Sequence, residues 1–563
     1  MASNPSDGVQ LVAVVAYETP HAPSAGITAV IRHSLAPLVA ATGRPTIVLT
    51  PFHHVTKRIP LTLIGSIAVP YNDAVIPVEI LAHGEYVFLR PTDSRFFAGR
   101  RHPYDLPEAD LLRDSLFFGA AVARTLPVLA VHFGLAADAP WALLLHDWEA
   151  ATAALALADQ PRHRNVLILH NVYDGALSGV GLTSAMLDAV GINPKLCPGP
   201  IGSDAATVLQ RSLQLSTLSR DVFAVSDQFA SDIVSDPYLS EVLAPHLREA
   251  LRPRLRGNTN GLFEKLQIPS SVFDPATRGD FAPLREWKQR SRATFCAALQ
   301  NFTPSADRPV WGDRAAFLAG ESDATTWFVT GGRDDARQRG HDVLAAAVPA
   351  CVTAHPEARF LFFVIPGEDG PSGLAFLQRL AEAHPGKVLI LPFIFREGYF
   401  DALRGASWAV MPSLYGPFES ANEFYLFGVP GVARAAGGLL QQIVPLRAAA
   451  CFSRAVQTRA DRWHSTSATP TGLLYRESDV PTALADWQTI NTTGGPDRMT
   501  ARSALPLFQA MARELAVAIG DAVRIGRDQP DSYCRMLVDG IGSLQRTLSW
   551  ERNAQEYVRL MNE

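Results

Sequence analysis

The sequence predicts an α/β protein made of two doubly wound domains, each built around a parallel sheet. Short apolar runs recur along the chain, and Ala/Leu-rich stretches of helical character separate them. Continuous apolar runs of this kind are typical of parallel strands that helices cover on both faces. With 563 residues, the chain is also too long for one ordinary core.

The apolar runs form two series, and we interpret each series as one sheet. The first series is 11–15, 46–49, 142–145, 166–169 and 222–225, and the second is 327–330, 360–364, 388–391 and 408–411. A polar stretch between about Pro269 and Ser322 separates them. We therefore expect one domain over 1–280 and another over 281–535, facing each other across a cleft.

A final helix is expected within 536–563. Ser549 is a suitable N-cap residue for this helix. An apolar stripe at helical spacing follows it, made of Trp550, Ala554, Tyr557 and Met561. On this pattern alone, the segment is an amphipathic helix that packs on a core.

The composition is that of a folded globular protein. Hydrophobic residues make up 47% of the chain and charged residues 19%. The net charge of -5 gives no basic footprint for a nucleic acid. The most apolar region, 116–145, is interrupted by charged residues and proline, so no membrane span is expected.

The five cysteines lie far apart and show no Cys-x-x-Cys spacing. Neither a zinc site nor a disulfide framework is therefore indicated, and the expected compartment is reducing. The first residues lack the basic-then-apolar plan of a secretory signal. We expect a soluble cytoplasmic protein, and the sequence does not indicate an oligomeric state.

The segment 405–439 carries the strongest functional signal. It predicts a buried strand, a turn at Pro412-Ser413, a short helix that carries Glu423, and a second strand that leads to the glycine pair Gly437-Gly438. Such a unit directs a carboxylate and bare N–H groups to the carboxyl edge of a sheet. Open α/β sheets bind nucleotides and sugars at that edge.

A second candidate loop follows the predicted strand 327–330. Gly331-Gly332 and Arg333 end the strand, and Arg339-Gly340 precede an amphipathic helix. Fork-shaped guanidinium groups near a helix start suit phosphate oxygens. The competing interpretation is a solvated basic helix start.

The first domain offers three similar strand ends. His-Asp147-Trp-Glu149 follows one strand, and His170-Asn171 follows the next. Gly26, after the first strand, opens a helix that runs to about Thr42, and its bare N–H groups are suited to a phosphate. Each of these residues alone is also compatible with an ordinary turn. No Walker loop, complete GxGxxG, HExxH or GxSxG motif is apparent.

These motifs, in this order, resemble those of glycogen and starch synthases. The segment 405–439 is similar to their nucleotide-sugar segment, with its second glutamate at Glu423 and its Arg-x-x-Gly-Gly-Leu ending. The loop at Arg333 is similar to the Gly-Arg-(five residues)-Lys-Gly-x-Asp loop of the eukaryote-type enzymes, with Arg339 at the lysine position. The chain departs from the family at Gly416, where the first glutamate is expected, and before Gly26, where the family has a lysine.

The resemblance implies the GT-B fold, two Rossmann-like domains with a last helix that crosses back to the first domain. It implies a retaining hexosyltransferase that moves glucose from ADP- or UDP-glucose to an α-glucan or other saccharide acceptor, with no cofactor and no metal. The implied catalytic residues are His170, Arg333, Arg339, Glu419 and Glu423, and the implied donor-binding residues are Gly26, Asp147, Asn171, Arg434, Gly437, Gly438 and Leu439.

Two further interpretations stay open. Either Glu419 takes the role of the missing first glutamate, or no residue takes it. The departures at Gly416 and before Gly26 favour a catalytically impaired sugar-binding or regulatory protein. A nearer alternative is an active transferase with another donor sugar or acceptor.

Overall fold

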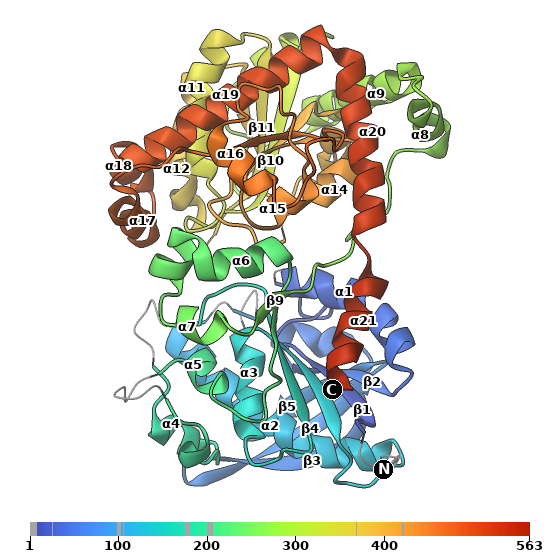
Figure 1. Ribbon diagram of the computed structural model, residues 1–563, viewed down its shortest axis with the longest axis vertical. Coiled ribbons are helices and arrows are strands. Elements are labelled where there is room, and N and C mark those ends of the chain that lie inside the picture. The colour runs from blue at the N-terminus through green and yellow to red at the C-terminus, as the bar shows by residue number, and fades with distance from the viewer. Residues whose placement is uncertain are drawn as a thin grey trace. The chain divides into compact units, whose positions relative to one another are not determined.

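The computed structural model describes residues 8–24, 26–97, 99, 103–104, 106–174, 181–199, 206–367, 369–418 and 421–562. The chain divides into two compact units, shown in Figure 1. The first unit extends to Phe263 and also contains the end of the chain from Ser549. The second unit extends from Glu264 to Leu548.

The first unit is built on a nine-stranded sheet with the order β3-β4-β5-β2-β1-β6-β7-β8-β9. Its strands are β1 (Leu11–Val15), β2 (Thr46–Pro51), β3 (Thr62–Tyr71), β4 (Ala74–His83), β5 (Tyr86–Pro91), β6 (Trp141–His146), β7 (Arg164–Leu169), β8 (Val222–Ala224) and β9 (Leu255–Gly257). The pairs from β5-β2 to β8-β9 are parallel, whereas β3-β4 and β4-β5 are antiparallel. The sequence predicts the parallel strands except β5 and β9, and it gives no sign of the antiparallel extension.

Helices surround this sheet, and the central strands β1 and β6 are completely buried. The helices are α1 (Gly26–Thr42), α2 (Glu108–His132), α3 (Asp147–Ala156), α4 (Ser184–Ala189), α5 (Val208–Ser212), α6 (Asp227–Ser235), α7 (Arg248–Leu251) and α21 (Trp550–Met561). In the described part of the chain, α2 is the one helix long and apolar enough to cross a membrane. Most of it is buried inside the unit, as is usual for the core helix of a soluble protein.

The second unit is built on a six-stranded, wholly parallel sheet with the order β12-β11-β10-β13-β14-β15. Its strands are β10 (Thr326–Arg333), β11 (Ala358–Ile365), β12 (Val388–Ile390), β13 (Trp408–Met411), β14 (Gly431–Arg434) and β15 (Leu473–Tyr475). All four runs of the second predicted series are strands of this sheet. The strand order reverses between β10 and β13, since β11 and β12 lie on one side of this pair and β14 and β15 on the other. Open sheets bind ligands at such a switch point.

The helices of the second unit are more numerous. They are α8 (Ser270–Thr277), α9 (Ala282–Asn301), α10 (Arg314–Ala319), α11 (His341–Ala354), α12 (Ala375–Ala383), α13 (Tyr399–Gly405), α14 (Ala421–Leu426), α15 (Gly437–Gln442), α16 (Arg454–Ala460), α17 (Ala483–Thr492), α18 (Arg498–Ser503), α19 (Pro506–Asp528) and α20 (Pro530–Thr547). Helix α11 packs along α19, as Figure 1 shows. Helix α9 packs along α13.

The boundaries between the units differ from the expected 280/281 and 535/536. Helix α8 packs on α9 and α20, and the backbone N–H of Gln267 donates to the carbonyl of Leu426 (2.9 Å). The segment 264–280 therefore belongs to the second unit. Helix α20 packs on α8, α14 and α19, so the final segment of the first unit begins only at Ser549.

The last helix, α21, belongs to the first unit, as the resemblance implied. The Ser549 hydroxyl accepts a hydrogen bond from the N–H of Arg552 (3.2 Å), which confirms the predicted N-cap. All four residues of the predicted apolar stripe are buried. The side-chain amides of Asn553 and Asn258 each donate to the backbone carbonyl of the other residue, at 3.2 and 3.0 Å. Helix α21 also packs along α1, which Figure 1 shows beside it.

Candidate functional site

The loop 334–340 leads from β10 to α11 and lies against the segment that follows β13. Gly340 has φ 64°, and a Cβ atom at this position would lie 2.2 Å from the carbonyl oxygen of Pro412. Only glycine fits such a contact without a shift of the backbone. The N–H of Leu414 donates to the carbonyl of Gln338 (2.6 Å), which joins the two loops a second time.

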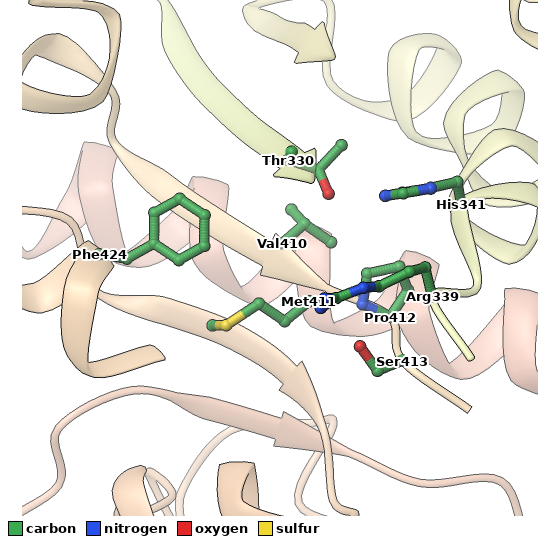
Figure 2. Close-up of a pocket in the computed structure, with 9 residues that line it drawn as sticks. Thr330, Arg339, His341, Val410, Met411, Pro412, Ser413 and Phe424 are labelled. Atoms are coloured by element: carbon green, nitrogen blue, oxygen red, sulfur yellow. The ribbon is translucent and has the colours of Figure 1, made fainter. Parts of the chain in front are cut away.

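A pocket opens where these two loops meet, at the carboxyl ends of β10 and β13, as Figure 2 shows. It is lined by Thr330, Gly331, Arg339, His341, Val410, Met411, Pro412, Ser413 and Phe424. The lining combines one guanidinium group, one imidazole and two hydroxyls with an apolar floor.

A buried network of charged groups holds the loop in place. Arg498, on α18, donates to both carboxylate oxygens of Asp334 (2.6 and 2.8 Å), and Asp334 also bonds to Nδ1 of His341 (3.0 Å). Arg502, one helical turn later, bonds to Asp342 (2.7 Å) and to the carbonyl of Ala336 (2.8 Å). Because each charge has a partner inside the protein, the loop is fixed at several points.

These contacts also determine the charge of Asp334. Burial would raise its pKa, but the hydrogen bonds and charges of His341 and Arg498 outweigh burial and hold the pKa well below its usual range. Asp334 is therefore an ionised carboxylate at neutral pH. Asp334, Asp342 and the two arginines were not predicted as site residues, although Arg498 and Arg502 are one helical turn apart.

The two arginines expected to bind phosphate are placed differently. Arg339 is half-buried and lines the pocket. Arg333 is the last residue of β10 and is exposed, and it is not among the residues that line the pocket. Of the two, Arg339 therefore has the position that a phosphate-binding side chain requires.

Glu423 lies in the first turn of α14, next to Phe424, which lines the pocket. Burial raises the pKa of Tyr399 to about 12, and the nearby charge of Glu423 contributes to this shift. Glu419 lies outside the described residues.

Arg434 is not available to a ligand in this structure. Its guanidinium is 1% exposed and forms a bidentate ion pair with Glu477, with Nε at 2.9 Å from Oε2. Its remaining nitrogen donates to the carbonyl of Leu414 (2.5 Å). Burial would raise the pKa of Glu477, but the arginines beside it, Arg434 and Arg476, lower it to about 2. The predicted donor-binding role of Arg434 is therefore corrected to that of a buried structural pair.

The glycine pair is explained by close packing. Gly437 has φ 48°, and a Cβ atom there would lie 1.6 Å from the carbonyl oxygen of Gly416. The N–H of Gly438 donates to the same carbonyl (3.0 Å), so it is not a bare N–H group as expected. Leu439 is completely buried. The Gly-Gly-Leu motif thus holds the segment at Gly416 against the start of α15.

In the first unit, three predicted residues meet at the ends of β6 and β7. The carboxylate of Asp147 accepts hydrogen bonds from the N–H of His170 (2.6 Å) and from the side-chain amide of Asn171 (3.2 Å). Asp147 has φ 62°, a conformation that is uncommon for residues other than glycine. Such strain is typical of functional positions.

Two further residues of the His-Asp-Trp-Glu motif, His146 and Glu149, also lie here, although they were not among the predicted site residues. Nδ1 of His146 lies 2.8 Å from Nε2 of His170, and burial lowers the pKa of both imidazoles, that of His146 to about 4. Glu149 is buried, and burial together with Asp147 raises its pKa. Burial also raises the pKa of Asp147 to about 7. The site at His170 is thus a desolvated group of uncharged imidazoles beside two weakened acids.

The start of α1 differs from the expectation for Gly26. The buried carboxylate of Glu18 accepts hydrogen bonds from the N–H groups of Ser24 (2.7 Å) and Ile27 (3.1 Å) and from the hydroxyl of Thr28 (3.0 Å). A carboxylate of the chain therefore occupies the position where an external phosphate was expected.

Known proteins share both sequence and fold with this chain. Residues 11–249 match the family described as the starch synthase catalytic domain. A glycogen synthase of Desulfatibacillum aliphaticivorans is 32% identical over 117 residues, which are 20% of this chain and 22% of that protein. The alignment thus spans about a fifth of the length of that relative.

Two solved structures are similar over almost the whole chain. The catalytic domain of starch synthase IV from Arabidopsis thaliana, bound to ADP and acarbose, has a TM-score of 0.66 and 16% identity and covers 98% of this chain and 99% of that chain. The N-terminal domain of a trehalose-6-phosphate phosphatase from Candida albicans has a TM-score of 0.50 and 11% identity and covers 100% and 98%. These likenesses establish the fold. The chain therefore has the GT-B fold of starch synthase IV, and its residues 11–249 are similar to the starch synthase catalytic domain.

Proposed function

We propose that this protein is a retaining glycosyltransferase that moves a glucosyl unit from ADP- or UDP-glucose to an α-glucan acceptor. The pocket at the ends of β10 and β13 carries the proposal, because it places the guanidinium of Arg339 beside the start of α11. Positive charge and unpaired N–H groups at a helix start attract a diphosphate.

The chemical step requires that negative charge be stabilised on the departing nucleoside diphosphate. Arg339 is suited to this, since a guanidinium offers several donors in a fixed geometry. The charged network around Asp334 and Arg498 keeps the loop from moving when the charge develops. The proposal includes no metal and no cofactor.

The group at His170 is proposed to contact the transferred sugar. Its imidazole and that of His146 stay uncharged at neutral pH because burial lowers both pKa values. Uncharged imidazoles donate or accept hydrogen bonds from sugar hydroxyls without an added charge. Asp147 positions His170 through the backbone N–H.

A second candidate function is favoured by specific observations. The Glu18 carboxylate occupies the start of α1, and Gly416 stands where the family has its first glutamate. Both departures fit a sugar-binding or regulatory protein without turnover, or a transferase with another donor or acceptor. The proposed setting in each case is the cytoplasm.

The test is the transfer of radiolabelled glucose from ADP- or UDP-glucose to glycogen by the purified chain. We expect incorporation by the wild type and a loss of about two orders of magnitude in Arg339→Ala, as is usual when a charge-stabilising group is removed. Arg379→Ala, an exposed arginine on α12, is the matched control and should retain activity. Donor binding without transfer to any acceptor would favour the regulatory protein, and no binding of either donor would contradict both functions.

A further inference from the structure

His341 is the first residue of α11 and has a side chain that the proposed function leaves without a role. It is 2% exposed, and its Nδ1 bonds to Asp334 (3.0 Å). No other hydrogen bond of its side chain is found within the described residues. Figure 2 shows the ring extending from α11 toward Thr330, into the pocket it lines. A polar atom of a buried side chain thus points into the pocket.

The tautomer of this imidazole follows from its partner. Asp334 is ionised and accepts two hydrogen bonds from Arg498, so its oxygen also accepts a hydrogen bond from the Nδ1–H group of His341. In the uncharged imidazole, Nε2 then holds a lone pair. In the imidazolium, Nε2 carries an N–H group that faces the pocket.

Charged groups of both signs surround the His341 ring. The carboxylate of Asp334 favours positive charge on the ring, whereas Arg339, which also lines the pocket, and Arg498, on α18, disfavour it. Asp342, the next residue on α11, is paired with Arg502. Glu423 lies on α14 next to the lining residue Phe424. An anion bound in the pocket would add negative charge beside the His341 ring.

We propose that His341 binds the diphosphate of the ligand as an imidazolium, through Nε2, so that binding takes up one proton from solvent at that atom. This inference rests on the proposed function and deepens it, since it assigns a second anion-binding side chain to the same site. The Nε2–H group donates to a phosphate oxygen, and no covalent bond is formed or broken. The hydroxyls of Thr330 and Ser413, which also line the pocket, are available as further donors.

The loop 334–340 and the residues after it resemble the family pattern Lys-Gly-x-Asp, in which His341 takes the variable position x between Gly340 and Asp342. The pattern therefore does not require a histidine at this position. The hydrogen bonds that Asp334 forms with Arg498 and with His341 therefore involve a histidine that the family pattern does not specify. A carboxylate that bonds to one ring nitrogen of a histidine fixes the orientation of the ring, and thus the direction in which the other nitrogen meets a ligand.

Calorimetric titration of the full chain with ADP, UDP and inorganic pyrophosphate tests the inference. The titrations are done at pH 6 and pH 8, in buffers of low and high ionisation enthalpy. We expect tighter binding at pH 6 and uptake of about one proton at pH 8, visible as a dependence of the heat on the buffer. Adenosine and uridine should show no such dependence, because they lack phosphate.

Three variants make the result specific. His341→Ala should bind the diphosphates about tenfold more weakly at pH 6 and lose the proton uptake, as expected for a charge-assisted hydrogen bond. His341→Gln retains an uncharged donor and should recover part of the affinity without any proton uptake. His355→Ala, at the other end of the same helix, is the matched control and should behave as the wild type.

The outcomes separate this inference from the proposed function. If the wild type binds diphosphates and His341→Gln has the same affinity and the same proton uptake as the wild type, the inference is overturned and the proposed function stands. If the wild type binds neither nucleoside diphosphate nor pyrophosphate, the proposed function fails and the role of His341 fails with it. Melting curves of the variants establish that each one is folded.

Discussion

Single residues determine which motif positions are available for chemistry. Arg434 matches the family motif in sequence, yet its guanidinium is fully used by Glu477 and by a backbone carbonyl. The partner lies 43 residues away, and a sequence pattern does not indicate a contact across that separation. By contrast, the contact of Asp147 with His170 follows from a simple rule, since both residues end neighbouring parallel strands.

The Arg434–Glu477 pair gives a stability prediction. Glu477→Gln leaves Arg434 as an uncompensated buried charge, which should lower the free energy of unfolding by about 3–5 kcal/mol. Glu382→Gln, an exposed change on α12, should be close to neutral. Urea unfolding of the two variants measures the difference. A Glu477→Gln protein as stable as the wild type, but unable to bind ADP, would show that Arg434 serves the ligand instead.

At the scale of the element, the parallel strands could be predicted from the sequence. The antiparallel strands and the residues that hold the loop before α11 in place could not. Every apolar run assigned to a strand is a strand, because parallel strands buried on both faces leave an unmistakable signal. The antiparallel strands β3 and β4 have partly exposed faces and do not form such runs. The loop before α11 was recognised from its glycines and arginines, but its anchor Arg498 lies 164 residues from Asp334.

The same loop gives a prediction about Gly340. In Gly340→Ala, the added methyl group would lie 2.2 Å from the carbonyl of Pro412, in a conformation with φ 64° that disfavours alanine. The loop must shift away from the pocket, and we expect ADP to bind at least about tenfold more weakly. Gly526→Ala on α19, where a Cβ atom meets nothing within 4 Å, is the control. Equal ADP affinity in calorimetry for both variants would contradict a fixed loop.

At the scale of the molecule, the chain returns to its first unit through α21. The side chain of Trp550 donates to the carbonyl of Leu262 (2.7 Å) and packs against Phe263, with ring centroids 5.3 Å apart. A Cβ atom at Gly261 would lie 2.5 Å from the same indole. The sequence predicted the helix and its buried stripe. The residues that receive it could not be predicted, because they lie almost 300 residues earlier.

Trp550→Ala should therefore destabilise the first unit selectively. Loss of a buried tryptophan typically costs about 3–5 kcal/mol. In hydrogen exchange, peptides that cover α1 and β8 should lose protection, while peptides of the second unit should not change. Gln555→Ala, an exposed change on the same helix, should leave both units protected. Loss of protection confined to the second unit would contradict this assignment of α21.

The central claim is that the second unit holds a diphosphate at the ends of β10 and β13. A crystal structure of the full chain soaked with ADP or UDP tests this most directly. We predict phosphate density within hydrogen-bonding distance of the Arg339 guanidinium and of Nε2 of His341. Diphosphate density at another place, with none beside Arg339, would contradict the proposed diphosphate site.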